Sequence, residues 1–342
     1  MTVPISPSLL DVYDALLLDL DGTLMHGGVP IPHAADGVRT ARERGALIGF
    51  ITNNASRTPD AVVAHLAEVG VQAEAHEVAT SPQIAVQLLA QHVEEGVTVL
   101  VVGAESLASE VAGAGFTPVF RDSEDVAAVI QGFSPTLGWA DLAEGCYALR
   151  RGVPWVATNT DATLPTERGM APGNGSLVHT LVHATGRTPL VAGKPQPEMF
   201  ALAAEKLGAR RPLVVGDRLD TDIEGGNRAG MDTLLVLTGV DGIAEAVHAE
   251  PLLRPTWILP DLSTLTAPAP RPLVQGDSAR CGASGARWDG EDIVLTGQSA
   301  DPRALHAALA LIAQRHEEAR FGGAVREESG TVIAPPAEAP AP

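Results

Sequence analysis

Short apolar runs alternate with helix-like stretches in the first part of the chain. The apolar runs at residues 15–18 and 47–52 predict strands, and the spacing of apolar residues at 34–44 and 59–69 predicts helices. A glycine follows each predicted helix, as is common at helix ends. Because β-α-β alternation is typical of a parallel sheet covered by helices, the pattern predicts an α/β protein.

The alternation returns in the second half, after a middle segment that has strand and helix patterns of its own. The further strands are predicted at residues 212–216, 233–237 and 256–259, and the further helices at 198–207 and 222–229. We therefore predict a Rossmann-like, doubly wound parallel core formed by residues 1–80 and 189–266. An inserted α/β cap is predicted at residues 81–188.

The C-terminal part has a different composition. Pro268-Ala-Pro-Arg-Pro272 resembles a linker, and residues 273–330 predict a small α+β module with an amphipathic helix at 302–318. The apolar stripe of that helix needs a partner, either the cap or a second subunit. Residues 331–342 are rich in proline and alanine and are predicted to be disordered. A chain ending near Thr266 is expected to fold without this part.

The charge balance narrows the function classes. The 342 residues include 23 Lys and Arg against 42 Asp and Glu, a net charge of −19, which argues against nucleic acid or an anionic membrane as a partner. No apolar run is long enough to cross a bilayer, and the N-terminus does not resemble a secretory signal. Two distant cysteines, Cys146 and Cys281, fit a reducing cytoplasm.

Acidic residues follow two of the predicted strands. Asp19-Leu20-Asp21-Gly22-Thr23 comes directly after the first strand, and Asp217 comes directly after the strand at 212–216. Strand ends of a parallel sheet meet at one edge, so Asp19, Asp21 and Asp217 form a set of oxygen ligands suited to Mg²⁺. One carboxylate of the first pair can attack phosphorus or bind metal while the other exchanges a proton. A plain Asp-Gly turn is the alternative.

Polar and basic residues occupy two further strand ends. Thr52, Asn53 and Asn54 follow the strand at 47–52 and could hold phosphate oxygens through hydroxyl, amide and backbone N–H groups, although Thr52 alone would be an ordinary strand terminator. Only two lysines occur in the chain. Lys206 fits a solvated helix surface, whereas Lys194 stands between an apolar run and a helix, where a compact positive charge could face an anion.

Together these segments resemble the haloacid dehalogenase superfamily over residues 14–265. The four motifs correspond, in order, to Asp19-x-Asp21, Thr52, Lys194, and Asp217 with Asp222. Further strings resemble the α/β-capped subfamily that includes p-nitrophenyl phosphatases, phosphoglycolate phosphatase and pyridoxal phosphatase: Ile51-Thr-Asn-Asn54, Thr158-Asn-Thr-Asp161, Pro172-Gly-x-Gly-Ser176 and Gly193-Lys-Pro195.

The resemblance implies a Mg²⁺-dependent phosphatase. Asp19 would be the nucleophile and Asp21 the general acid and base, and Mg²⁺ would be held by Asp19, the main-chain carbonyl of Asp21, and Asp217. Asp222 would orient metal-bound water from outside the ligand set, and Lys194 would neutralise phosphate oxygens. Two other function classes fit the same residues. One is a phosphotransferase that uses the same nucleophile, and the other is a non-catalytic protein that binds a phosphometabolite.

The substrate is expected to be a small phosphate ester. Asp161-Ala-Thr-Leu164-Pro165 resembles the subfamily's specificity loop, in which Leu164 favours a small alcohol phosphate over pyridoxal 5′-phosphate, unless Leu164 only packs inside the cap. The layout of cap and short C-terminal module, which is partly acetyltransferase-like, resembles glycerol-3-phosphate phosphatases. Phosphoglycolate, sugar phosphates and nucleotides are the alternatives. A homo-oligomer formed through the cap or the C-terminal module is a further possibility.

Overall fold

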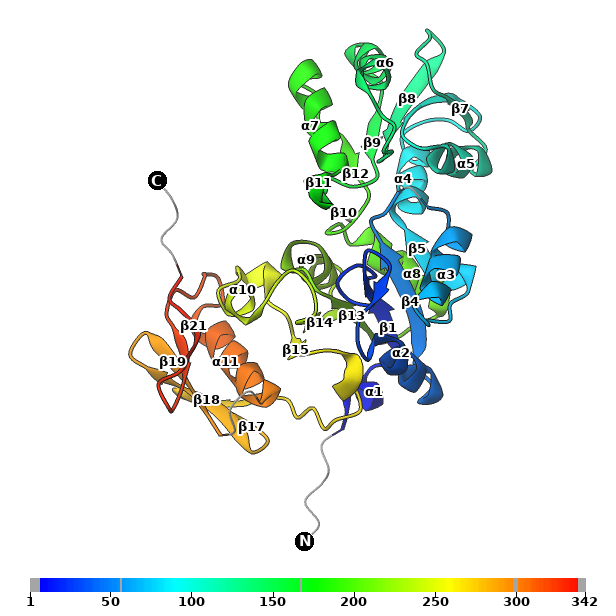
Figure 1. Ribbon diagram of the computed structural model, residues 1–342. Coiled ribbons are helices and arrows are strands. Elements are labelled where there is room, and N and C mark those ends of the chain that lie inside the picture. Colours follow the sequence, from blue (N-terminus) through cyan, green and yellow to red (C-terminus); the bar gives the residue numbers. More distant parts are fainter. Residues whose placement is uncertain (1–6, 56, 167, 298–300, 338–342) are drawn as a thin grey trace. The chain divides into compact units, whose positions relative to one another are not determined.

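The computed structural model describes residues 7–55, 57–166, 168–297 and 301–337, and Figure 1 shows its helices and strands. It divides into two compact units. The first consists of Met1–Gly49 and Leu207–Pro342, and the second of Phe50–Lys206. The domain boundaries expected from the sequence stay a prediction.

Four parallel strands in the order β15-β14-β13-β1 form the main sheet of the first unit. In that order their bounds are Trp257–Leu259, Asp232–Val236, Pro212–Gly216 and Ala15–Leu18. Leu18 at the end of β1 lies opposite Val215 of β13. Because parallel neighbours end at the same edge of a sheet, the residues that follow β1 and β13 emerge side by side.

Helices and a small hairpin connect these strands. The elements are α1 (Leu9–Val12), the hairpin β2 (Met25–His26) and β3 (Val29–Pro30), α2 (Ala34–Glu43), the turn of π-helix η2 (Leu219–Ile223), α9 (Glu224–Arg228), α10 (Ile243–Val247), and the short turns η3 (Pro251–Leu253) and η4 (Leu262–Thr264). The predicted helix at 222–229 thus begins earlier, as η2, and continues as α9. This tight connection brings residues 217–222 back toward the end of β13.

The C-terminal residues form a larger sheet than the sequence indicated. Six strands are ordered β16-β17-β18-β19-β20-β21, antiparallel except for the parallel pair β19 and β20. Their bounds are Leu273–Gln275, Ser278–Cys281, Ser284–Asp289, Asp292–Thr296, Val325–Glu327 and Val332–Ala334. The helix α11 (Pro302–Arg315) packs on this sheet and on β15.

This C-terminal part shares a hydrophobic core with the parallel sheet. One buried cluster includes Leu235 and Ile258 of the sheet together with Leu311 and Phe321 of the C-terminal part. The backbone N–H of Ile258 lies 3.1 Å from Nε2 of His306 on α11. The apolar stripe of α11 is therefore buried inside its own unit. A shared core gives no support to the expectation that a chain ending near Thr266 folds by itself.

The prediction of disorder from residue 331 onward is wrong for its first residues. Val332–Ala334 forms β21, which pairs with β20, and Ala334 is fully buried. The run of proline and alanine hid this strand, because Pro335 and Pro336 follow it directly. Residues 338–342 lie outside the described part of the chain.

The second unit contains a five-stranded parallel sheet in the order β12-β9-β8-β6-β7. In that order the strands are Leu190–Val191, Trp155–Ala157, Val126–Gln131, Thr98–Val102 and Thr117–Val119. The helices are α3 (Pro59–Glu68), α4 (Ser81–Ala90), α5 (Glu105–Gly113), α6 (Trp139–Arg150), α7 (Asn174–Thr185) and α8 (Glu198–Leu207). None of the described helices has the length and apolar character to cross a membrane.

Two further features of this unit carry predicted site residues, Thr52 at the end of β4 and Leu164 in β10. The strand β4 (Leu47–Thr52), within which the division between the units falls, pairs at its end with β5 (Val78–Thr80). The short 3-10 turn η1 (Ala75–Glu77) precedes β5, and the antiparallel hairpin of β10 (Thr163–Thr166) and β11 (Gly169–Pro172) precedes α7.

Candidate active site

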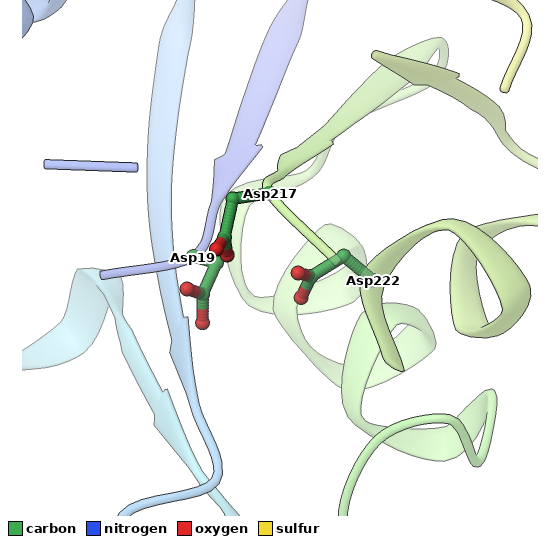
Figure 2. A group of neighbouring side chains, drawn as sticks. All are labelled: Asp19, Asp217 and Asp222. Carbon is green, nitrogen blue, oxygen red and sulfur yellow. The ribbon is translucent and has the colours of Figure 1, made fainter. Parts of the chain in front are cut away.

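Three carboxylates of the first unit meet at the edge of its parallel sheet. Asp19 follows β1, Asp217 follows β13, and Asp222 lies in η2. One oxygen of each lies within 4.8 Å of the others, and Figure 2 shows the three groups turned toward a common point. Asp217 and Asp222 are almost completely buried, and Asp19 is half-buried. The fold thus gathers three acids from two neighbouring strand ends.

Backbone bonds fix the segments that carry these acids. The N–H of Asp19 donates to the carbonyl of Val215 at 2.9 Å, which continues the pairing of β1 with β13. The carboxylate of Asp222 accepts a hydrogen bond from the N–H of Arg218 at 3.2 Å, and so closes the turn that folds back toward Asp217. The N–H of Val240 donates to the Asp217 carboxylate at 2.8 Å.

Glycines make room for the two buried carboxylates. A Cβ atom on Gly22 or on Gly239 would overlap the carboxylate of Asp217, and one on Gly216 would overlap that of Asp222. Gly22 also has a φ of +88°, a backbone conformation that favours glycine. The glycines of the Asp21-Gly22 and Gly216-Asp217 pairs therefore do more than form turns, because they leave room for the buried carboxylates.

The acidic cluster fits a divalent cation. Two carboxylates about 4 Å apart repel each other by roughly 4 kcal/mol at an effective dielectric constant of about 20, and a cation bound among the three would offset this repulsion. Carboxylate oxygens are hard ligands of the kind that Mg²⁺ prefers. The carboxylates of Asp19, Asp217 and Asp222 would hold the Mg²⁺ ion.

This cluster contains one carboxylate more than the predicted side-chain ligands, Asp19 and Asp217. The carboxylate of Asp222 belongs to the cluster itself, where the sequence placed it outside the ligands. The carboxylate of Asp21 is exposed and does not belong to it. The predicted metal contact of Asp21 runs through its main-chain carbonyl, which a cluster of side chains does not test. An exposed carboxylate next to Asp19 remains suited to proton exchange.

In the second unit, the side chain of Asn53 holds Lys194. Its Oδ1 accepts the backbone N–H of Lys194 at 2.8 Å, and its Nδ2 donates to the Lys194 carbonyl at 3.2 Å. The same Nδ2 lies 3.1 Å from a carboxylate oxygen of Asp161. Lys194 is buried. The amide of Asn53 therefore joins the end of β4 to the lysine and to the loop that leads to Leu164.

Further amides and hydroxyls complete this network. The backbone carbonyl of Asn53 accepts from Oγ of Ser81 at 2.9 Å and from Nδ2 of Asn159 at 2.7 Å. Nδ2 of Asn174 donates to the carbonyl of Asn159 at 2.8 Å. Asn159 and Asn174 lie in two segments whose sequence resembles the α/β-capped subfamily, but the sequence predicted no role for either residue. These bonds thus connect the ends of β4, β9 and β12 with the starts of α4 and α7.

The remaining predicted residues lie at the ends of their elements. Oγ1 of Thr52, which is buried at the end of β4, accepts the backbone N–H of Asn54 at 3.1 Å. Leu164 lies in β10, opposite Ala171, and its side chain is only partly buried. Packing inside the cap therefore does not account for the whole Leu164 side chain.

Comparisons with known proteins identify the family of this chain. A haloacid dehalogenase-like hydrolase model matches residues 16–117, and a HAD-hydrolase-like model matches residues 191–265. The D-glycerol 3-phosphate phosphatase of Mycobacterium tuberculosis is 51% identical over 271 residues, which are 78% of this chain and 76% of that protein. The chain belongs to the haloacid dehalogenase-like hydrolase family. This confirms the family predicted from the four motifs.

Solved structures confirm the predicted α/β fold of this hydrolase. The glycerol phosphate phosphatase of Mycobacterium tuberculosis, in complex with magnesium, has a TM-score of 0.83 at 42% identity, covering 95% of this chain and 97% of that one. The 4-nitrophenylphosphatase of Thermotoga maritima has a TM-score of 0.69 at 31% identity. It covers 75% of this chain and 98% of that one. About a quarter of the hydrolase thus has no counterpart in the second structure.

Proposed function

We propose that this hydrolase is a Mg²⁺-dependent phosphatase that cleaves a small alcohol phosphate, with glycerol 3-phosphate as the preferred substrate. The acidic cluster of Asp19, Asp217 and Asp222 is the observation that carries the metal-dependent chemistry. The substrate rests on the 51% identity to a D-glycerol 3-phosphate phosphatase. The proposed place of action is the cytoplasm, and the proposed partner is a small phosphate ester rather than nucleic acid.

The proposed reaction runs in two steps on Asp19. An oxygen of its carboxylate forms a bond to phosphorus while the bond from phosphorus to the alcohol oxygen breaks, and Asp21 gives that oxygen its proton. Asp21 then takes a proton from a water molecule, which attacks phosphorus and releases phosphate and free Asp19. A bound Mg²⁺ ion would offset the negative charges of the nucleophile and the phosphate.

The polar residues of the second unit would bind the phosphate oxygens. Lys194 would supply the positive charge, and the hydroxyl of Thr52 and the N–H of Asn53 would donate hydrogen bonds. The N–H of Asn54, also predicted to bind phosphate, donates to Oγ1 of Thr52 in this structure. The side-chain amide of Asn53 already bonds to Lys194 and Asp161. We therefore assign the side-chain amide of Asn53 the role of holding Lys194. Only the backbone N–H of Asn53 would bind the phosphate.

The substrate class rests on Leu164 and on the C-terminal part. An apolar side chain at this position offers no hydrogen bond to a polar aromatic ring such as that of pyridoxal 5′-phosphate. The C-terminal part lies within the region covered by the glycerol phosphate phosphatase structure. Phosphoglycolate, sugar phosphates and nucleotides are the rival substrates, and a phosphotransferase is the rival reaction.

Phosphate release from a panel of esters tests this proposal. The panel consists of glycerol 3-phosphate, phosphoglycolate, a sugar phosphate, AMP and pyridoxal 5′-phosphate, each with MgCl₂ and with EDTA. We expect the highest kcat/KM for glycerol 3-phosphate and no turnover in EDTA. A higher kcat/KM for AMP or pyridoxal 5′-phosphate would contradict the substrate, and full activity in EDTA would contradict the metal.

A further inference from the structure

The loop that follows β14 touches both segments that carry the buried acids. It runs from Thr238 to Asp241, between β14 and α10. The backbone N–H of Asp241 donates to the carbonyl of Asp217 at 3.0 Å. The carboxylate of Asp241 accepts the backbone N–H of Leu219 at 2.7 Å. Since Leu219 is the first residue of η2, one residue bonds to the main chain at both Asp217 and the turn that carries Asp222.

Two more bonds from this loop reach the same segments. The N–H of Val240 donates to the carboxylate of Asp217 at 2.8 Å, and Oγ1 of Thr238 donates to the carbonyl of Gly22 at 2.7 Å. Gly22 lies three residues after Asp19. The loop therefore contacts the segments of all three clustered acids, although none of its own side chains belongs to the cluster.

These hydrogen bonds from the loop hold the segments of the three carboxylates in place. Three carboxylates within 4.8 Å repel one another and would move apart unless other groups hold them. Outer groups that orient metal ligands typically change metal affinity about 10–100-fold when they are removed. Asp241 is itself acidic and lies near two other acids, Asp220 and Glu245, and near one base, Arg218. A further negative charge does not stabilise a cluster of carboxylates, so Asp241 can support the cluster only through its hydrogen bonds.

We propose that the loop Thr238–Asp241 is a positioning device for the metal site and that Asp241 is its central residue. The proposal rests on the proposed function, because it takes the acidic cluster as a Mg²⁺ site. Asp241 acts through its two bonds to the segments of Asp217 and Asp222 and touches neither metal nor substrate. Nothing in the sequence marked it, since a single Asp in a loop resembles an ordinary turn residue.

Calorimetric titration of the full-length protein with MgCl₂, without substrate, tests the proposal. Asp241→Ala should raise the dissociation constant for Mg²⁺ at least about tenfold, because the turn η2 loses its anchor. Asp241→Asn keeps an acceptor for the Leu219 N–H and should stay within about threefold of the wild type. An equal loss in both variants would mean that the charge of Asp241 matters and its bond does not, which would overturn the proposal.

Asp261→Ala is the matched control. Its carboxylate also accepts a backbone N–H at 2.7 Å, from Ser263 at the start of η4. Both Ala variants should lower the Tm of the metal-free protein by similar amounts, but only Asp241→Ala should weaken Mg²⁺ binding. Wild-type affinity in Asp241→Ala would overturn the proposal.

A second variant, Thr238→Val, removes the hydroxyl that bonds to Gly22 and keeps the shape of the side chain nearly the same. Loss of the bond to Gly22 should weaken Mg²⁺ binding about three- to tenfold, and unchanged binding would contradict the role of the loop, even if Asp241→Ala does not fold. A wild-type protein that binds no Mg²⁺ would instead contradict the proposed function, so the two failures can be told apart.

Discussion

The acidic cluster of the first unit and the Asn53 network of the second are built in opposite ways. The cluster brings together three like charges, which are held by backbone bonds and by glycines that leave room for them. In the Asn53 network, one amide holds the backbone of Lys194 and also bonds to the Asp161 carboxylate, while the Asn53 carbonyl accepts from Ser81 and Asn159. The cluster therefore concentrates negative charge that a bound cation would offset, whereas the network fixes the chain through directed hydrogen bonds.

This contrast predicts different consequences of substitution. A change in the cluster should affect metal binding and the chemical step, because the charges themselves take part. A change in the network should affect the placement of Lys194 and leave Mg²⁺ binding as it is.

Asp19→Asn should fold normally and lose more than about 10³-fold in kcat, because an amide is a very poor nucleophile and a weaker metal ligand. Asp14→Asn is the matched control, since Asp14 precedes β1 and its carboxylate accepts only the backbone N–H groups of Arg210 and Arg211 among the bonds described. Steady-state kinetics and circular dichroism of both variants check this. Activity of Asp19→Asn near that of the control would refute the nucleophile.

Asn53→Ala should lower kcat/KM roughly 10–100-fold, because Lys194 loses both of its backbone bonds to the amide. The dissociation constant for Mg²⁺ should not change. Asn227→Ala provides the control, since the Asn227 amide also bonds to two backbone carbonyls, those of Leu252 and Arg254. If Asn53→Ala weakened Mg²⁺ binding as strongly as a cluster variant, the contrast between the two regions would fail.

Leu164→His should narrow the preference for glycerol 3-phosphate over pyridoxal 5′-phosphate by about tenfold, the lower end of the discrimination of about 1–3 kcal/mol that one side chain supplies. Leu190→His makes the same change at an exposed position of β12 and should leave the preference as it was. The ratio of kcat/KM values for the two esters is the quantity to compare. An identical ratio in all three proteins would show that Leu164 does not face the substrate.

The stability of the first unit should fall in mild acid. Burial lowers the pKa of His306, whose ring lies against Ile258 in the core shared with the C-terminal part. The unfolded chain therefore takes up a proton at this histidine near pH 6.5, whereas the folded chain does so only at lower pH. The stability due to neutral His306 is complete above about pH 6.5 and is lost as the pH falls below it.

Urea denaturation from pH 7.5 to pH 5.5 measures this effect. The wild type should lose free energy of unfolding over that range, and His306→Gln, which keeps a polar side chain without titrating, should lose less. His183→Gln, at a histidine of α7 in the second unit, should follow the wild type. The same slope in wild type and His306→Gln would contradict the assignment.

The sequence predicted the meeting of two acids better than the groups that hold them. Asp19 and Asp217 directly follow β1 and β13, and neighbouring strands of a parallel sheet end at one edge, so residue type and spacing were enough to predict that their carboxylates lie close together. The roles of Asp21 and Lys194 stay predictions. A sequence does not show how far η2 folds back, so it did not predict that the Asp222 carboxylate lies within 4.8 Å of the other two. The roles of Asn53 and Asp241 depend on bonds between residues far apart in the chain, for which spacing gives no signal.

The C-terminal part shows a second limit of sequence reasoning. The apolar stripe of α11 indicated that it packs on something but not on what. Its partners, β15 and the strands β17 and β18, became visible only in the fold. The linker-like segment of prolines suggested a separable module, whereas Cys281 and Ile258 belong to the same buried cluster.

The central claim is that Asp19 carries the phosphoryl group during turnover. Rapid acid quenching of the wild-type protein with ³²P-labelled glycerol 3-phosphate and MgCl₂, followed by peptide mapping, tests it most directly. We predict label on the peptide that contains Asp19, at up to one phosphate per chain, and none in EDTA or in Asp19→Asn. Label on a different residue, or label that persists in Asp19→Asn, would contradict the account.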